Sequence, residues 1–113
     1  MTDCIFCKIV RGEIPADKVY EDEYILIFRD IQPAAPTHLL CIPKAHIASA
    51  AEIDDGNVDL VGRVFVQLAV VAKDLGLGRG FRIVTNCGED GGQTVGHLHF
   101  HLLGGRQLIW PPG

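Results

Sequence analysis

Three histidines alternate with apolar residues near the end of the sequence, in the run His97-Leu98-His99-Phe100-His101-Leu102-Leu103. An imidazole can act as a nucleophile, as a general acid or base, or as a metal ligand. Successive side chains of a β-strand point to opposite faces, so a strand would place the histidines in one row at a spacing of about 6.6 Å. We therefore predict a strand over 97–103 whose histidine face forms a reactive or metal-binding site.

A second group that could do chemistry is the pair Cys4 and Cys7. Two cysteines at this spacing can bind one metal ion or form a redox pair. Zinc would need two more ligands, which His46 and one histidine of the row can supply. A redox pair is less favoured, because the βαβ pattern of a thioredoxin-like motif is not found around these cysteines. The remaining interpretation is that both thiols are simply buried beside neighbouring apolar residues.

The loop 87–96, which leads into the histidine row, contains four glycines. Glycines allow backbone N–H groups to turn toward an anion, although the spacing matches neither a P-loop nor a dinucleotide-binding motif. Two chemistries remain open: a metal hydrolase in which the histidines bind a catalytic ion, and attack of an imidazole on phosphorus. The loop glycines, Gln93 and the Thr94 hydroxyl suit a phosphate, which favours the nucleophile.

The elements that must position these residues follow from hydrophobic periodicity. Strands are predicted over 18–21, 24–30, 37–42 and 81–86, with a turn at Asp22-Glu23. His38, at the start of the third strand, is interpreted as a satisfied polar residue rather than as part of a site. One long helix is predicted from about 54 to 75, and its core stripe consists of Val58, Val61, Phe65, Leu68, Ala72 and Leu75.

Val66 and Val70 lie on the opposite side of this helix from the predicted core stripe. A second apolar face indicates packing against another chain, so we expect a homo-oligomer, in the form of a two-fold dimer. The alternative is that these are isolated exposed valines, which are common on protein surfaces.

Length and composition limit the remaining possibilities. A chain of 113 residues with 48% apolar residues predicts a single domain over 1–113 with its own core. The net charge of −4, without a cluster of Lys and Arg, argues against a nucleic-acid partner. The sequence has no 18-residue apolar run and no signal-like core, so a membrane partner is not expected. Four cysteines without such a signal predict reduced thiols and a cytoplasmic location.

The sequence resembles the histidine-triad family, whose signature is His-φ-His-φ-His-φ-φ with φ an apolar residue. The histidine row fits this signature, and the similarity extends over essentially the whole chain. The final segment 104–113 resembles the histidine-triad nucleotide-binding branch, whose members are similar to purine nucleoside phosphoramidases. Further matching segments are Phe6-x-Lys8-Ile9, Glu13-Ile14-Pro15, Phe28-x-Asp30-Ile31, Ala35-Pro36-Thr37-His38, Ile42-Pro43-Lys44-x-His46-Ile47 and Asp90-Gly-Gly-Gln-Thr94.

The resemblance implies an α+β fold: a five-stranded antiparallel sheet with one long helix and a short N-terminal helix, dimerising into a ten-stranded sheet. The implied activity is hydrolysis of purine nucleoside phosphoramidates through a covalent nucleotidyl-histidine. His99 matches the nucleophile, and His101 matches the histidine that assists at the phosphate. Thr94 stands where the family has a serine. The alternatives are a dinucleoside polyphosphate hydrolase, or a nucleotide- or partner-binding module with incidental hydrolysis.

The resemblance also implies a purine nucleotide site and a metal site. Asp30 matches the acceptor for the ribose hydroxyls, and the other implied nucleotide contacts, besides Thr94, His99 and His101, are Ile5, Phe6, Ile9, Ile14, Phe28, Ile31, Asn86, Gly92, Gln93 and Val95. Some bacterial members are similar in carrying a zinc ion, which would here be bound by Cys4, Cys7, His46 and His97. His97 thus counts both as a triad histidine and as a metal ligand. The implied zinc is structural and is not required for the chemistry.

Overall fold

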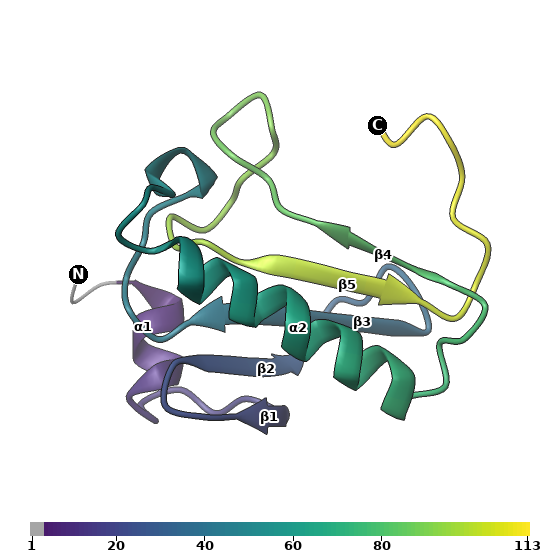
Figure 1. Cartoon of the computed structure of the whole chain (residues 1–113), viewed down its shortest axis with the longest axis horizontal. Coiled ribbons are helices and arrows are strands. Elements are labelled where there is room, and N and C mark those ends of the chain that lie inside the picture. Colours follow the sequence, from purple (N-terminus) through teal and green to yellow (C-terminus); the bar gives the residue numbers. More distant parts are fainter. Residues whose placement is uncertain (1–3) are drawn as a thin grey trace.

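Two helices lie on opposite faces of one antiparallel sheet (Figure 1). The computed structural model describes residues 4–113, and its five strands have the order β1-β2-β3-β5-β4. This confirms the predicted α+β fold. Within the described residues no helix has the length and apolar character needed to cross a membrane. The elements are α1 (Ile5–Val10), β1 (Lys18–Glu21), β2 (Ile25–Arg29), β3 (Thr37–Pro43), the 3-10 turn η1 (Ala50–Glu52), α2 (Val58–Asp74), β4 (Phe81–Val84) and β5 (Phe100–Gly104).

The two faces of the sheet form two separate apolar clusters, because strand side chains alternate. On one face Ile25 and Ile27 of β2 pack with Val64 and Leu68 of α2. On the other face α1 lies against the alternate residues of β2 and β3. The central strands β2 and β3 are therefore buried on both sides, as their nearly continuous apolar sequences predict.

Helix α2 begins later than predicted, and part of its core stripe is different. Asp54 accepts hydrogen bonds from Gly56 and Asn57 and so closes a separate turn, which leaves Val58 as the first helical residue. Gly76, at a φ of 76°, follows the end of the helix. Of the predicted stripe, Val58, Phe65 and Leu75 are exposed, whereas Val64 and Val71 take buried positions instead. The buried face is rotated around the helix because the sheet contacts α2 from a different side.

The histidine row is only partly a strand, which corrects the prediction for 97–103. Strand β5 begins at Phe100, which pairs with Cys41 of β3. Continued, this register would place Leu98 opposite Pro43, which has no N–H for the ladder. Leu98 instead donates its N–H to the Ile47 carbonyl, at 2.6 Å. The alternation nevertheless continues, since Leu98, Phe100 and Leu102 all point into the cluster beneath α2.

Candidate active site and metal centre

His99 is held through one of its two ring nitrogens, Nδ1. Its Nδ1 donates a hydrogen bond to the main-chain carbonyl of His97, at 2.7 Å. Because the proton sits on Nδ1, the neutral ring carries a lone pair on Nε2. The ring is 5% exposed and meets the edge of Phe6 at a centroid distance of 5.1 Å. Thr85, which the sequence did not single out, donates to the His99 carbonyl at 2.8 Å.

His101 is held in the opposite tautomer by His38. The main-chain N–H of Ala34 donates to His38 Nδ1 at 2.9 Å, so the proton of a neutral His38 lies on Nε2. This Nε2 is 2.9 Å from His101 Nδ1 and 3.4 Å from a carboxylate oxygen of Asp30. His101 Nδ1 is therefore the acceptor, and its Nε2 carries a proton available for donation. His38 is hydrogen-bonded through both ring nitrogens, as the interpretation of a satisfied polar residue requires, but one of its partners is a triad histidine, which the sequence did not predict.

The surroundings of His101 keep its ring neutral. Burial lowers the pKa of His101 to about 4, and the nearby His99 and His38 rings add to this effect. At neutral pH the ring can therefore donate from Nε2 without carrying a charge. A neutral ring with a proton on Nε2 can donate a hydrogen bond to an anionic group.

We predict that His101 makes the folded state less stable in acid. An unfolded histidine has a pKa of about 6.5, so the unfolded chain binds more protons at this position, and stability falls as pH drops from about 6.5 toward 4. The loss amounts to at most about 3 kcal/mol. Urea unfolding at pH 7 and pH 5 should show a smaller pH dependence for His101→Asn than for the unsubstituted chain. An equal dependence in both proteins would contradict this role, since they share every other titratable group.

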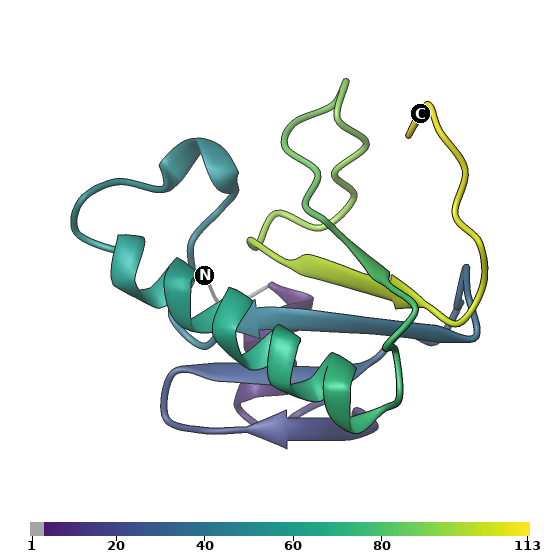
Figure 2. The same ribbon diagram turned by 45° about the vertical axis from the view of Figure 1, so that its right-hand side comes forward.

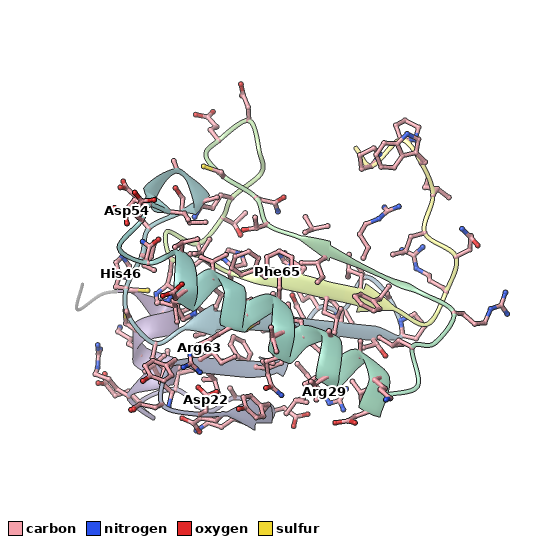
Figure 3. All side chains as sticks on the ribbon, in the orientation of Figure 1. Asp22, Arg29, His46, Asp54, Arg63 and Phe65 are labelled. Carbon is pink, nitrogen blue, oxygen red and sulfur yellow. The ribbon has the colours of Figure 1, made fainter. Side chains whose placement is uncertain are left out.

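His97, the first histidine of the triad, points to the two N-terminal cysteines. His97 is fully buried, its Nε2 donates to the Pro43 carbonyl at 2.8 Å, and its Nδ1 lies 3.2 Å from Cys4 Sγ and 3.6 Å from Cys7 Sγ. His46 completes the group, with its Nδ1 3.3 Å from Cys7 Sγ. Figure 3 shows His46 at the same end of the molecule as α1. All four ligand atoms lie within 4.8 Å of one another.

The chemistry of this cluster fits a divalent cation. Burial lowers the pKa of His97, which keeps its imidazole neutral, as a ligand must be. Burial and the adjacent Cys4 raise the pKa of Cys7, so two thiolates are disfavoured here without a positive charge between them. Two sulfurs and two imidazole nitrogens form a complete tetrahedral zinc set with no position left for water.

The three triad histidines do not converge on one ion. Within residues 4–113, each group of candidate metal ligands contains a single triad histidine: His97 in the cysteine cluster, and His101 in a group with Asp30 and His38. The His38 and His101 nitrogens of that second group are already hydrogen-bonded to each other. The geometry thus favours attack by an imidazole over a metal hydrolase.

Most of the predicted purine contacts gather beside His99. The cluster between α1 and the sheet contains Phe6, Ile9 and Phe28, with Ile14 and Val95 packed against it. Phe6 lies between the two cysteines in sequence, and its ring contacts the rings of Phe28, His97 and His99. Ile5 and Ile31 lie outside this cluster, and Ile31 is 95% exposed.

The loop 87–96 is shaped by Gln93. The side-chain amide donates to the carbonyls of Ala48 and Val95, and its oxygen accepts from the N–H of Gly88. Gly92 adopts a φ of 81°, which turns the chain at this point. Thr94 is exposed and Asn86 half-buried. The Gln93 side chain thus holds the loop that precedes the triad.

Comparisons with known proteins agree with this arrangement. A family model described as the HIT domain matches residues 11–108. The chain belongs to the HIT family. A solved structure described as a HIT family hydrolase from Legionella pneumophila is 52% identical and has a TM-score of 0.97, with 98% of this chain and 100% of that one covered.

Two further relatives carry more specific descriptions. A 14 kDa zinc-binding protein of Zea mays is 50% identical to this chain, over 96% of this chain and 87% of the maize protein. A histidine triad nucleotide-binding protein from Candida albicans has a solved structure with 36% identity and a TM-score of 0.82, covering 96% of this chain and 83% of that one.

Proposed function

We propose that this protein hydrolyses purine nucleoside phosphoramidates through a covalent nucleotidyl-His99 intermediate. The observation that carries the proposal is the pair of opposite tautomers: a lone pair on His99 Nε2 next to a proton on His101 Nε2. The two rings lie 5.1 Å apart between centroids. Nucleophile and hydrogen-bond donor can therefore act on the same phosphate group.

In this proposal each side chain acts at a stated atom. His99 Nε2 attacks phosphorus, the P–N bond breaks, and the leaving amine takes a proton from solvent water. The positive charge that develops on the His99 ring is stabilised through Nδ1–H by the His97 carbonyl, while His101 Nε2–H donates to a phosphate oxygen. Water then cleaves the P–Nε2 bond, which releases the nucleotide and regenerates the free imidazole.

The remaining site residues are proposed to hold the nucleoside. The cluster of Phe6, Ile9 and Phe28 offers an apolar wall for a purine beside His99. Asp30 presents a carboxylate next to His38, suited to accept from ribose hydroxyls. Thr94 and the loop backbone provide donors for the phosphate. Membership of the HIT family and the nucleotide-binding description of the Candida albicans relative support this assignment.

The direct test is to mix the protein with an adenosine phosphoramidate and to follow both products. AMP release, together with an acid-labile adenylyl group on the peptide that contains His99, would support the proposal. Release of AMP without any adduct would replace the covalent route by direct attack of water. No release and no adduct would leave a nucleotide-binding module.

We propose that His38 positions His101, and a pair of substitutions tests this. His38→Ala removes the N–H that fixes the His101 tautomer and should lower kcat by about 10- to 100-fold. His38→Gln keeps an N–H donor near the same place and should recover part of that loss. Steady-state kinetics of both variants decide the point, and equal rates for alanine and glutamine would exclude a role for the hydrogen bond.

We propose that the cluster of Cys4, Cys7, His46 and His97 binds a structural zinc ion. Support comes from the complete donor set and from the description of the maize relative as a zinc-binding protein. When bound, the ion supplies charge neutralisation and a cross-link. The residues of the cluster then fix α1, and with it Phe6, against the triad.

We also propose that the protein is a two-fold dimer through α2 and β4. One exposed face of α2 is apolar from Val58 to Val70, and β4 is an edge strand of the sheet. Phe65 is 46% exposed and lies on the side of α2 that faces β5 and β4 (Figure 3). A second copy can cover the helix face and the strand edge together. The members of the helix face are Val58, Gly62, Phe65, Val66, Ala69 and Val70.

A further inference from the structure

A positively charged cleft lies at the start of β4. It has a volume of about 280 Å³, lies between the α2–β4 turn and the beginning of the C-terminal segment, and is lined by Arg79, Arg106 and Gln107 together with three glycines. A second cleft of about 210 Å³ shares these three side chains and adds Arg82. Three arginines thus line two overlapping clefts on a chain whose net charge is −4.

The charges of these arginines are not neutralised within the described part of the chain. Arg82 donates to the Ile109 carbonyl at 2.9 Å, and Arg106 donates to the carbonyls of Ala34 and Gln107. These acceptors are uncharged. None of the ion pairs found among residues 4–113 includes Arg79, Arg82 or Arg106. The cleft therefore has the chemistry to receive carboxylates.

An exposed acidic tip lies beyond the other end of β4. Glu89 and Asp90 stand at the turn of the loop 87–96, and within residues 4–113 neither forms an ion pair. Figures 1 and 2 both show this loop and the C-terminal segment rising on the same side of the sheet, one from each end of β4. The free edge of β4 thus has an acidic arm at its end and a basic cleft at its start.

We propose that in the dimer the acidic tip of each copy enters the arginine cleft of the other. Two-fold pairing of β4 edges is antiparallel, so the start of one strand lies next to the end of the other. The partner's Glu89 and the partner's Asp90 are thereby brought to Arg79, Arg82 and Arg106, and symmetry repeats the contact at the other end. The inference rests on the proposed dimer and adds what specifies its register.

The contact has a consequence for the site. The loop that carries Glu89 and Asp90 continues through Thr94 into His97 and His99. Within one chain Gln93 holds the base of this loop, through its bonds to Ala48 and Val95. In the dimer the partner's arginines hold the tip as well, so the loop is held at both its base and its tip.

Charge reversal tests the contact. Arg79→Glu and the double substitution Glu89→Lys with Asp90→Lys should each raise the dimer dissociation constant about tenfold or more at low salt. Combining all three should recover part of the affinity lost in the double substitution and should cost less than the two separate effects added together, because Arg79→Glu offers the reversed tip one carboxylate while Arg82 and Arg106 stay positive. Arg79 is chosen because Arg82 and Arg106 also hold carbonyls of their own chain. Sedimentation equilibrium gives the constants.

Glu23→Lys is the matched control, since it makes the same charge change beside β1, at the opposite edge of the sheet. It should leave the dissociation constant unchanged. Where the dimer is too tight for sedimentation, faster amide hydrogen exchange in residues 87–96 of dimeric Arg79→Glu provides the second measurement. An intact dimer with unchanged affinity and exchange in the charge-reversal variants would overturn the contact alone. If the unsubstituted protein is a monomer, the dimer proposal is wrong as well. Neither result bears on the hydrolysis proposal.

Discussion

Replacing His99 by asparagine is expected to lower kcat/KM for an adenosine phosphoramidate by a factor on the order of 10⁴. The asparagine side-chain N–H can take the place of the imidazole Nδ1–H and keep the bond to the His97 carbonyl. What disappears is the lone pair at Nε2, for which asparagine has no counterpart. The substitution therefore removes the nucleophile while preserving the local hydrogen bonding.

Three measurements on His99→Asn separate chemistry from folding. The dissociation constant for AMP should remain close to that of the unsubstituted protein, and the thermal midpoint should fall only modestly, because asparagine keeps the hydrogen bond while it loses the ring contacts with Phe6 and His101. The adenylylated peptide should be missing from mass spectra. Turnover within tenfold of the original rate would show that His99 is not the nucleophile, and a collapse of the thermal midpoint would show that its main role is structural.

The fold was largely predictable because its determinants are local. Alternating and continuous apolar runs identify the strands, and β2 and β3 are buried on both faces as their composition requires. The errors arise where a contact between elements distant in sequence decides which residues are buried. The core stripe of α2 was misplaced because all its candidate residues are apolar, and only the position of the sheet selects Val64 and Val71 over Val58 and Phe65.

The sequence identified most residues of the candidate site but not how their side chains are oriented. The histidine row was recognised from the spacing alone, yet His97 is turned toward Cys4 and His101 toward His38 by partners far away in sequence. His38 was missed because its contact depends on strand register. Leu40 pairs with His101 and His38 with Leu103, so His38 lies diagonally across from His101. Sequence periodicity identifies a face of a strand but not the neighbour it meets.

The tautomers of the triad histidines could not be predicted from the sequence either. Each is set by a main-chain group: the Pro43 carbonyl for His97, the His97 carbonyl for His99, and the Ala34 N–H for His38, which in turn sets His101. Three imidazoles of the same type thereby present different nitrogens: one that faces the two cysteines, one with a lone pair at Nε2, and one that carries a proton at Nε2. The fold, rather than the side-chain chemistry, distinguishes them.

Cys7→Ser is expected to abolish zinc binding and to lower the thermal midpoint by roughly 10–20 °C in zinc-containing buffer. At free zinc about 1,000-fold above the dissociation constant, a bound ion contributes about 4 kcal/mol to stability, and each kcal/mol shifts the midpoint of a domain of this size by roughly 3–6 °C. Cys7 Sγ contacts both imidazoles of the cluster, with His46 Nδ1 at 3.3 Å and His97 Nδ1 at 3.6 Å. A serine hydroxyl is a far poorer zinc ligand than a thiolate.

Cys87→Ser is the matched control, because Cys87 is exposed and lies outside the cluster. This variant should retain about one zinc per chain and an unchanged thermal midpoint, measured by elemental analysis and calorimetry. Chelation of the unsubstituted protein should reproduce the Cys7→Ser midpoint, while the same chelation of Cys7→Ser should have no further effect. Equal metal content in the two serine variants would rule out the cluster as the zinc site.

Kinetics of the Cys7→Ser variant determine whether the metal takes part in the reaction. Because His99 is held by the main-chain carbonyl of His97, and not by its ring, and His101 is held by His38, neither reactive nitrogen contacts a metal-binding atom of the cluster. Loss of the metal loosens α1 and therefore Phe6, whose ring contacts His99 and the apolar wall. At a temperature where Cys7→Ser is folded, KM should rise by about tenfold while the adenylyl-His99 adduct still forms. Loss of the adduct in a folded, nucleotide-binding Cys7→Ser protein would assign the metal a direct part in the chemistry.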